Sequence, residues 1–115
     1  MTDKVRNVSQ EEFVREVEAA LGGLPVLVDF SADYCAPCRA FNPVLEALAE
    51  DWEDRLRVLK VDVEAEPELA ARFRVKGVPT LQLFRAGQAI AGRSGALSYG
   101  KLREFLEGAL AEPAA

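Results

Sequence analysis

The sequence predicts an α/β protein with a five-stranded mixed sheet flanked by four helices, which cover both faces of the sheet. Segments rich in apolar and β-branched residues alternate with segments whose apolar residues recur every three or four positions. Two strand-like segments near the C-terminal end are separated only by a short turn that contains glycine. Helices between strands require parallel crossovers, whereas a hairpin adds an antiparallel edge, so the predicted order is β-α-β-α-β-α-β-β-α.

The first predicted helix begins at Ser9, which forms a capping box with Glu12. The order places a strand before this helix, to which we assign no particular residues. An apolar stripe follows the cap, and the helix ends at Gly22-Gly23. The stripe and the hydrophobic staple across the cap consist of Val8, Phe13, Val14, Val17 and Leu21.

Two segments, 26–30 and 57–63, consist mainly of apolar and β-branched residues and are predicted to be buried strands. Residues 36–51 between them have the apolar spacing of a helix. Pro43 lies inside this helix and predicts a kink there. The apolar stripe of the helix consists of Phe41, Leu45, Leu48 and Trp52.

A short helix is predicted to start at Pro67, because proline suits the first turn of a helix. It carries Leu69 and Phe73. Residues 80–85 and 88–93 then form the hairpin, in which Gly87 supplies a positive φ angle.

The last predicted helix is capped by Ser98, and its apolar residues recur at helical spacing. No repeat or linker interrupts the chain, so residues 1–115 are predicted to form a single domain with a frayed tail at about 111–115. The buried face of the last helix consists of Leu102, Phe105, Leu106, Ala109 and Leu110.

Composition and charge exclude several classes of function. The formal net charge is −5 and the basic residues form no block, so we expect no nucleic-acid partner. No apolar run approaches the roughly 18 residues of a membrane span, and the N-terminus lacks the apolar stretch of a secretory signal, so we expect a cytoplasmic protein without a membrane partner. The chain has no histidine, which excludes Cys–His and Ser–His catalysis and removes the commonest metal ligand, so no metal site is expected.

The only two cysteines, Cys35 and Cys38, are separated by Ala36 and Pro37 and lie where the strand 26–30 leads into the next helix. Free N–H groups and the positive end of the helix dipole would stabilise a thiolate on Cys35. The first turn also brings the two sulfurs close enough to bond. A structural disulfide, two buried apolar cysteines, or a metal site completed by a second chain are the alternatives. The position at a helix start favours a reactive dithiol, in which one thiolate attacks a disulfide and the second thiol resolves the intermediate.

Together with the order of the elements, these residues make the chain resemble the thioredoxin family over nearly its whole length. The resemblance implies the thioredoxin fold and protein dithiol–disulfide exchange, with Cys35 as nucleophile, Cys38 as resolving thiol and no cofactor besides their disulfide. The segments that carry the resemblance are Val28-Asp29-Phe30, Cys35-Ala36-Pro37-Cys38-Arg39, Pro43, Lys60-Val61-Asp62, Gly77-Val78-Pro79-Thr80, Gly87 and Gly95-Ala96-Leu97.

The resemblance also implies roles outside the motif. Asp29 corresponds to the buried acid of the family, Lys60 to the lysine near that acid, and Pro79 to the cis-proline. Asp29 interrupts an apolar run, where an acid is unfavourable unless it has a partner or a task, although a surface aspartate on an edge strand remains an alternative. Strand alternation leaves Lys60 open between an exposed and a functional lysine.

For substrate binding, the resemblance implies that an extended client segment pairs with the backbone of Val78 beside the sulfurs. The family usually has Trp-Cys-Gly-Pro-Cys and a further tryptophan shortly before this motif, where the chain has Tyr34, Ala36 and Ser31. These departures predict a less aromatic rim around the active site. The expected substrate-binding residues are Tyr34, Ala36, Pro37, Val78, Pro79 and Gly95.

The sequence therefore predicts a monomeric, general protein-disulfide reductase whose partners are disulfide-containing client proteins. A separate enzyme of the thioredoxin-reductase type would recharge it, since the chain has no G-x-G-x-x-G nucleotide-binding loop. A disulfide oxidase or isomerase is one alternative, but related oxidising proteins often carry histidine inside the motif, which this chain lacks. A thioredoxin-like binding subunit with incidental thiols is the other alternative, and its function would survive Cys35→Ser.

Overall fold

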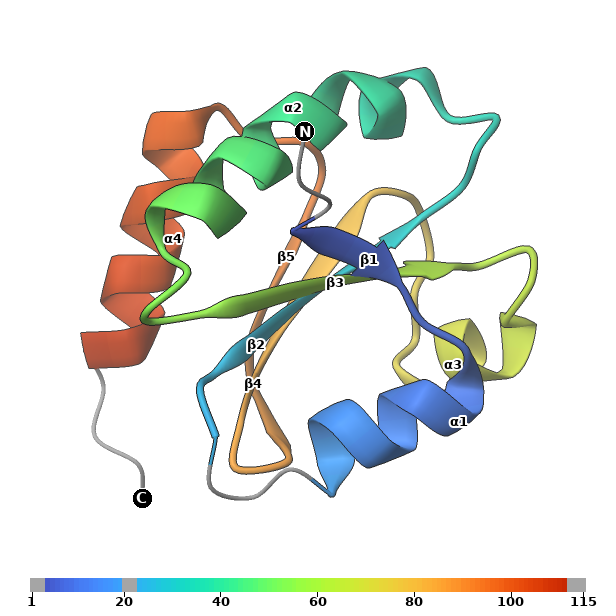
Figure 1. Ribbon diagram of the computed structural model, residues 1–115. Coiled ribbons are helices and arrows are strands. Elements are labelled where there is room, and N and C mark those ends of the chain that lie inside the picture. Colours follow the sequence, from blue (N-terminus) through green and yellow to red (C-terminus); the bar gives the residue numbers. More distant parts are fainter. Residues whose placement is uncertain (1–3, 20–22, 112–115) are drawn as a thin grey trace.

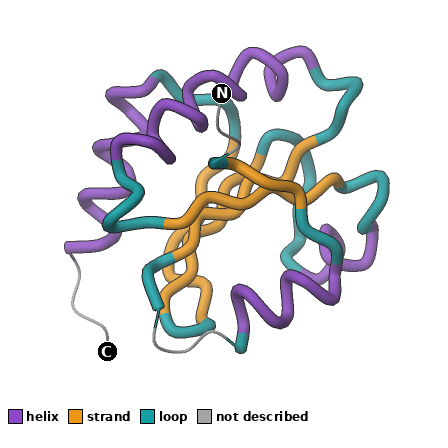
Figure 2. Tube along the Cα trace, in the orientation of Figure 1, coloured by secondary structure: helices purple, strands orange, loops and turns teal. Residues whose placement is uncertain are grey.

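The computed structural model describes residues 4–19 and 23–111 and shows a central sheet between two layers of helices (Figure 1). The same layers are visible in Figure 2, where the strands run through the middle of the molecule. The predicted α/β class, the five-stranded mixed sheet and the helices on both faces are confirmed. In chain order the elements are β1 (Val5–Asn7), α1 (Gln10–Phe13), η1 (Val14–Glu18), β2 (Val26–Ser31), α2 (Ala36–Asp51), β3 (Arg57–Asp62), α3 (Pro67–Arg72), β4 (Thr80–Arg85), β5 (Gln88–Ser94) and α4 (Tyr99–Ala111).

The sheet has the strand order β1-β3-β2-β4-β5. The strands β1, β3 and β2 are parallel, whereas β4 runs antiparallel to β2, and β5 runs antiparallel to β4. β2 lies at the centre of the sheet, and every one of its residues is buried. The register places Asp29 of β2 between Lys60 of β3 and Leu81 of β4.

Each face of the sheet packs against its own helices. One apolar cluster contains the buried residues of α4 and, apart from Cys38, those of α2, and the other contains those of α1, η1 and α3. Figure 1 shows α2 and α4 on one side of the sheet and α1 and α3 on the other. Leu27 belongs to the first cluster and Val28 and Phe30 to the second, as the alternation of side chains along a strand requires. Asp29, two residues after Leu27, therefore lies on the face that α2 covers.

The start of the first helix is confirmed in detail. Ser9 Oγ accepts a hydrogen bond from the Glu12 N–H at 3.2 Å, and the Glu12 carboxylate accepts one from the Ser9 N–H at 2.9 Å. Val8 and Phe13, on either side of the cap, are both buried. The capping box and the staple thus fix the point where the chain turns from β1 into α1, which packs on the same face of the sheet as α3.

The rest of this helix differs from the prediction. After the α-helical turn the chain continues as the π-helix η1, in which the Ala19 N–H donates to the Val14 carbonyl at 2.8 Å. Apolar residues four positions apart, such as Phe13 and Val17, return to about the same face in either winding, so this spacing could not distinguish them. Val14 was expected in the buried stripe but is 42% exposed. Leu21 and Gly22 lie outside the described residues.

The hairpin between β4 and β5 requires positive φ angles at both residues of its turn. Gly87 has a φ of 81°, as predicted, and Ala86 has a φ of 51°, which the sequence did not predict. Two-residue hairpin loops of the I′ type need positive φ at both central positions, because only this twist matches the flanking strands. The strand pairing therefore imposes on Ala86 a conformation that alanine by itself disfavours.

The C-terminal helix is capped as predicted, because Ser98 Oγ accepts a hydrogen bond from the Lys101 N–H at 3.2 Å. α4 continues through Ala111, which was predicted to belong to the frayed tail; the remainder of that tail lies outside the described residues. Pro43 lies inside α2, and the kink expected there stays a prediction. Among the described residues, no helix has the length and apolar character to span a membrane.

Candidate active site

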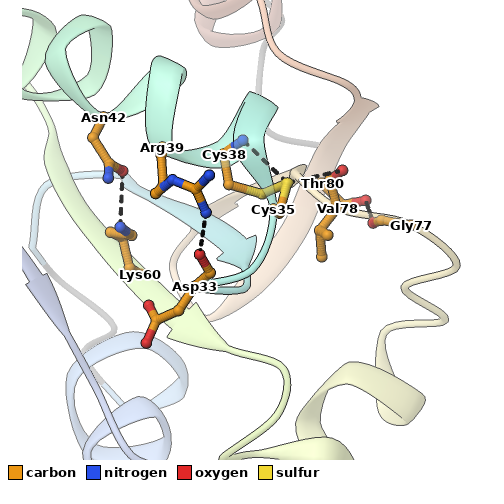
Figure 3. Close-up of a disulfide and its surroundings, with 9 residues drawn as sticks. All are labelled: Asp33, Cys35, Cys38, Arg39, Asn42, Lys60, Gly77, Val78 and Thr80. Carbon is orange, nitrogen blue, oxygen red and sulfur yellow. Dashed lines mark hydrogen bonds between the residues drawn. A yellow bond between two sulfur atoms is a disulfide. The ribbon is translucent and has the colours of Figure 1, made fainter.

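The two cysteines lie where β2 leads into α2 (Figure 3). Cys35 is the N-cap of α2 and has an extended backbone, with φ of −86° and ψ of 110°. Its Sγ accepts a hydrogen bond from the Cys38 N–H at 3.1 Å. Cys35 and Cys38 are joined in a disulfide, with their Cα atoms 5.2 Å apart. The predicted placement at a helix start is confirmed, and in the reduced protein the same N–H group and helix dipole favour a thiolate on Cys35.

The two cysteines differ in their exposure to solvent. Cys35 is 7% exposed and Cys38 is 2% exposed. Tyr34, immediately before the pair, is 68% exposed, and Ala36 and Pro37 are exposed as well. An incoming disulfide therefore meets Cys35 before it can reach Cys38.

A second segment of the chain lies against Cys35. The carbonyl oxygen of Val78 is 3.7 Å from Cys35 Sγ, and the Val78–Pro79 peptide bond is cis, as the resemblance implies. The Thr80 hydroxyl donates to the Gly77 carbonyl at 2.6 Å and closes the loop that presents Val78 (Figure 3). The start of β4 thus brings backbone groups to the edge of the disulfide.

The predicted substrate-binding residues lie around this segment. The Gly95 N–H donates to the Pro79 carbonyl at 2.8 Å, and Gly95 has a φ of 90°, a conformation that favours glycine. On the other side of Val78 there is a pocket of about 210 Å³, largely apolar except for one lysine. The residues that line it are Tyr34, Val63, Ala70, Val75, Lys76, Gly77 and Val78.

Asp29 is completely buried on the central strand, so the interpretation as a surface aspartate on an edge strand is wrong. Burial raises the pKa of Asp29 to about 7, although the positive charge of Lys60 acts in the opposite direction and lowers it. Among the described residues, neither carboxylate oxygen of Asp29 has a hydrogen-bond partner. The carboxyl group can therefore gain or lose a proton close to neutral pH.

Lys60 is half-buried, and its ammonium group donates a hydrogen bond to Asn42 Oδ1 at 2.8 Å (Figure 3). The lysine is thus tied to α2 and is not a freely solvated surface residue. Sequence reasoning missed Asn42. A signal was present, because Asn42 follows Cys38 by four residues and so lies on the same face of the helix.

Two further residues near the cysteine pair are Arg39 and Ser31. The guanidinium group of Arg39 donates to the Asp33 carbonyl at 2.5 Å and ties the loop before Cys35 to the first turn of α2. Ser31 is only 5% exposed, because β2 continues through it. Of the three departures from the family pattern, Tyr34 and Ala36 are therefore exposed, whereas Ser31 is buried.

Comparison with known proteins assigns the chain to a family. Residues 4–108 match the family model described as Thioredoxin. The chain belongs to the thioredoxin family. It is 40% identical over 110 residues to the thioredoxin of Acidithiobacillus ferridurans, which covers 96% of this chain and 100% of that protein. It is 37% identical over 107 residues to the thioredoxin of Pseudomonas aeruginosa, covering 93% and 97% of the two chains. It is also 38% identical over 109 residues to the chloroplastic thioredoxin X of Arabidopsis thaliana, covering 92% and 58%.

Family membership and the bonded cysteine pair together confirm the predicted activity. The protein is a dithiol–disulfide oxidoreductase whose redox-active group is the Cys35–Cys38 disulfide. Within residues 4–19 and 23–111, no three Cys, Asp or Glu side chains are grouped in a way that could hold a metal ion.

Proposed function

We propose that this protein is a general reductase of protein disulfides, in which Cys35 is the nucleophile and Cys38 is the resolving thiol. The observation that carries this assignment is the asymmetry of the pair. Cys35 Sγ accepts a hydrogen bond from the Cys38 N–H at the start of α2, and Cys35 is the more exposed cysteine, whereas Cys38 is almost completely buried. A thiolate is favoured at the position that a client can reach.

The reaction is two successive exchanges. The Cys35 thiolate attacks one sulfur of a client disulfide, a bond forms between Cys35 and that sulfur, and the other client sulfur leaves as a thiolate and takes up a proton. Cys38 then loses its proton and attacks the Cys35 sulfur, and the Cys35–Cys38 disulfide forms. The bond between Cys35 and the client breaks, and the client sulfur leaves as a thiolate and takes up a proton. The client gains two electrons and the cysteine pair loses two.

Asp29 is proposed to accept the proton of Cys38, directly or through water, in the second exchange. Its pKa of about 7 suits this task, because a general base works best when its pKa is near the working pH. Asp29 also lies on the face of the sheet that α2 covers, and α2 is the helix that carries Cys38. Lys60 influences the base by its charge, which lowers the pKa of Asp29.

Client proteins are proposed to dock along the segment that contains Val78 and Pro79. The Val78 backbone lies beside Cys35, and an extended client segment would pair with it as an added strand. Tyr34, Ala36, Pro37 and Gly95 would form the surrounding contact surface. The pocket next to Val78 offers apolar walls for one client side chain and the Lys76 ammonium for a neighbouring carboxylate.

Return to the dithiol form needs an electron donor, and we propose a separate enzyme of the thioredoxin-reductase type. The cytoplasm is the proposed setting, because a reducing compartment keeps such a pair in the form that can attack. We propose that the chain acts as a monomer and a single domain. Within residues 4–19 and 23–111, the large apolar side chains that are exposed come from four different segments: Val14, Leu24, Tyr34 and Ile90.

Reduction of insulin disulfides by dithiothreitol tests the proposal, with Cys35→Ser and Cys38→Ser as a matched pair. We expect the wild type to accelerate the reaction and both variants to lose this catalysis. A redox titration against glutathione buffers tests the direction of electron flow. A strongly reducing potential supports the reductase, whereas a potential near the oxidising end of the family contradicts it.

A further inference from the structure

A buried acid and a lysine stand side by side on adjacent strands without pairing. Asp29 and Lys60 are direct partners in the parallel register of β2 and β3. The Asp29 carboxylate nevertheless has no hydrogen-bond partner among the described residues, Lys60 included. A buried carboxylate is strongly unfavourable when it is unpaired, so a neighbouring ammonium group on a flexible stem would normally be drawn to it.

The Lys60 ammonium is held elsewhere. Its hydrogen bond goes to Asn42 Oδ1 on α2, at 2.8 Å. Figure 3 shows the Asn42 side chain pointing from the helix towards the end of the Lys60 side chain. Of the described charged groups, Lys60 is the one whose charge acts on Asp29, so the direction in which Asn42 holds it matters for the acid.

Asn42 is an unusual choice for its position in the helix. It lies in the interior of α2, immediately before Pro43 and among residues that pack on the sheet. Asparagine is a poor helix former, because its side chain competes for backbone hydrogen bonds. Helix formation therefore does not explain this residue, whereas the bond to Lys60 does.

We propose that Asn42 is a positioning residue: its amide oxygen holds the Lys60 ammonium against α2 and thereby keeps this cation from forming an ion pair with the Asp29 carboxylate. The acid is thus left buried and unpaired, as a proton acceptor for Cys38 must be. The functional consequence rests on the proposed role of Asp29, but the positioning itself does not.

In the part of the chain that the structure describes, Lys60 is the one charged group whose influence on Asp29 is resolved. β3 contributes Lys60, and β4 contributes the apolar Leu81. α2 contributes the two cysteines, which do not titrate in the disulfide, and Arg39, whose exposed guanidinium is bound to the Asp33 carbonyl. The oxidised protein therefore isolates the influence of Lys60 on Asp29 from that of the thiols.

The test measures the pKa of Asp29 in the oxidised protein, from the ¹³C shift of its carboxyl group as a function of pH. Asn42→Ala removes the acceptor and suits a helix, and Asn42→Leu removes it while keeping the branched shape of the side chain. We expect either variant to lower the pKa of Asp29 by about one pH unit or more, because the released ammonium pairs with the carboxylate. Lys60→Met should raise the pKa, because a cation is removed.

Asn7→Ala is the matched control. Asn7 lies opposite Lys60 in the register of β1 and β3, but it is exposed, and no side-chain hydrogen bond joins the two among the described residues. This variant should leave the pKa of Asp29 unchanged. In a Lys60→Met background, Asn42→Ala should also have no effect, because Asn42 acts only through the lysine.

An unchanged or raised pKa of Asp29 in both Asn42 variants overturns the proposal, and so does a lowered pKa that persists without Lys60. Rates of resolution as a function of pH separate this inference from the proposed function. If Asn42→Ala lowers the pKa of Asp29 but leaves the pH profile of resolution unchanged, the positioning by Asn42 is supported and the role of Asp29 as base is wrong.

Discussion

Replacing Asp29 by asparagine should stabilise the folded protein at neutral and alkaline pH. The substitution keeps the shape of the side chain but removes the carboxyl group that burial leaves without a partner. In the unfolded chain this carboxyl group ionises with a pKa near 3.8, whereas in the folded protein its pKa is about 7. Folding therefore holds a proton on Asp29 over the whole range between these values.

The sign and size of the contribution of Asp29 to the free energy of unfolding follow from the difference between these two pKa values. A carboxyl group whose pKa is raised by folding costs nothing below pH 3.8, because it is protonated in both states. As pH rises towards 7 the unfolded state releases the proton first and gains stability relative to the folded state. The two values differ by about three pH units, each worth about 1.4 kcal/mol, so the folded protein loses about 4 kcal/mol. Asp29→Asn does not suffer this loss.

The assay is guanidinium unfolding of oxidised wild type and Asp29→Asn at a series of pH values from about 4 to 8. All other carboxyl groups contribute equally to both proteins, so the difference in free energy of unfolding reports Asp29 alone. We expect little difference near pH 4 and an advantage of the variant that grows to about 4 kcal/mol above pH 7. A difference that stays constant with pH would show that the pKa of Asp29 is not raised and would refute the argument.

Three further predictions concern the cysteines and the fold. Cys38→Ser should accumulate a mixed disulfide with client protein on non-reducing gels, because attack occurs and resolution does not; trapping through Cys38 in Cys35→Ser would reverse the assigned roles. Ser9→Ala should lower the free energy of unfolding by about 1 kcal/mol in denaturant titrations, because the capping box is lost; an unchanged midpoint contradicts this. Phe13→Ala should cost about 3 to 5 kcal/mol in the same measurement, because Phe13 is fully buried. The matched change at exposed Val14 should cost far less, and equal losses would contradict the packing described.

Much of the fold could be predicted because local signals and tertiary packing agree. The mainly apolar segment 26–30 is buried on both faces, so its composition is enough to predict a buried strand. The helical spacing of the apolar residues is enough to predict the buried face of α2, and Phe41 and Leu45 are buried as this spacing predicts. The position of Cys35 at the start of α2 follows from the same two boundaries.

The features that sequence reasoning missed depend on contacts between distant segments. The hydrogen bond between Lys60 and Asn42 joins β3 to α2, and no local sequence pattern predicts that these two side chains meet. The positive φ of Ala86 is imposed by the pairing of β4 with β5, because alanine itself would not choose it. The burial of Ser31 depends on where β2 ends, and strand boundaries are the least certain part of a sequence pattern.

Two residues of this site, Asp29 and Asn42, are unfavourable for the stability of the elements that contain them. Folding alone therefore does not explain why they are present. An apolar residue at position 29 would suit the central strand better, since ionisation of buried Asp29 is expected to cost about 4 kcal/mol of stability. Alanine at position 42 would suit the interior of α2 better than asparagine. Natural sequences depart from local rules mainly at functional sites. Asn42 binds the lysine that faces Asp29 in the sheet, so the two departures are joined by one side chain, Lys60. The proposed positioning of Lys60 by Asn42 would account for both residues, because it leaves the acid buried and unpaired near neutral pH beside the helix that carries Cys38.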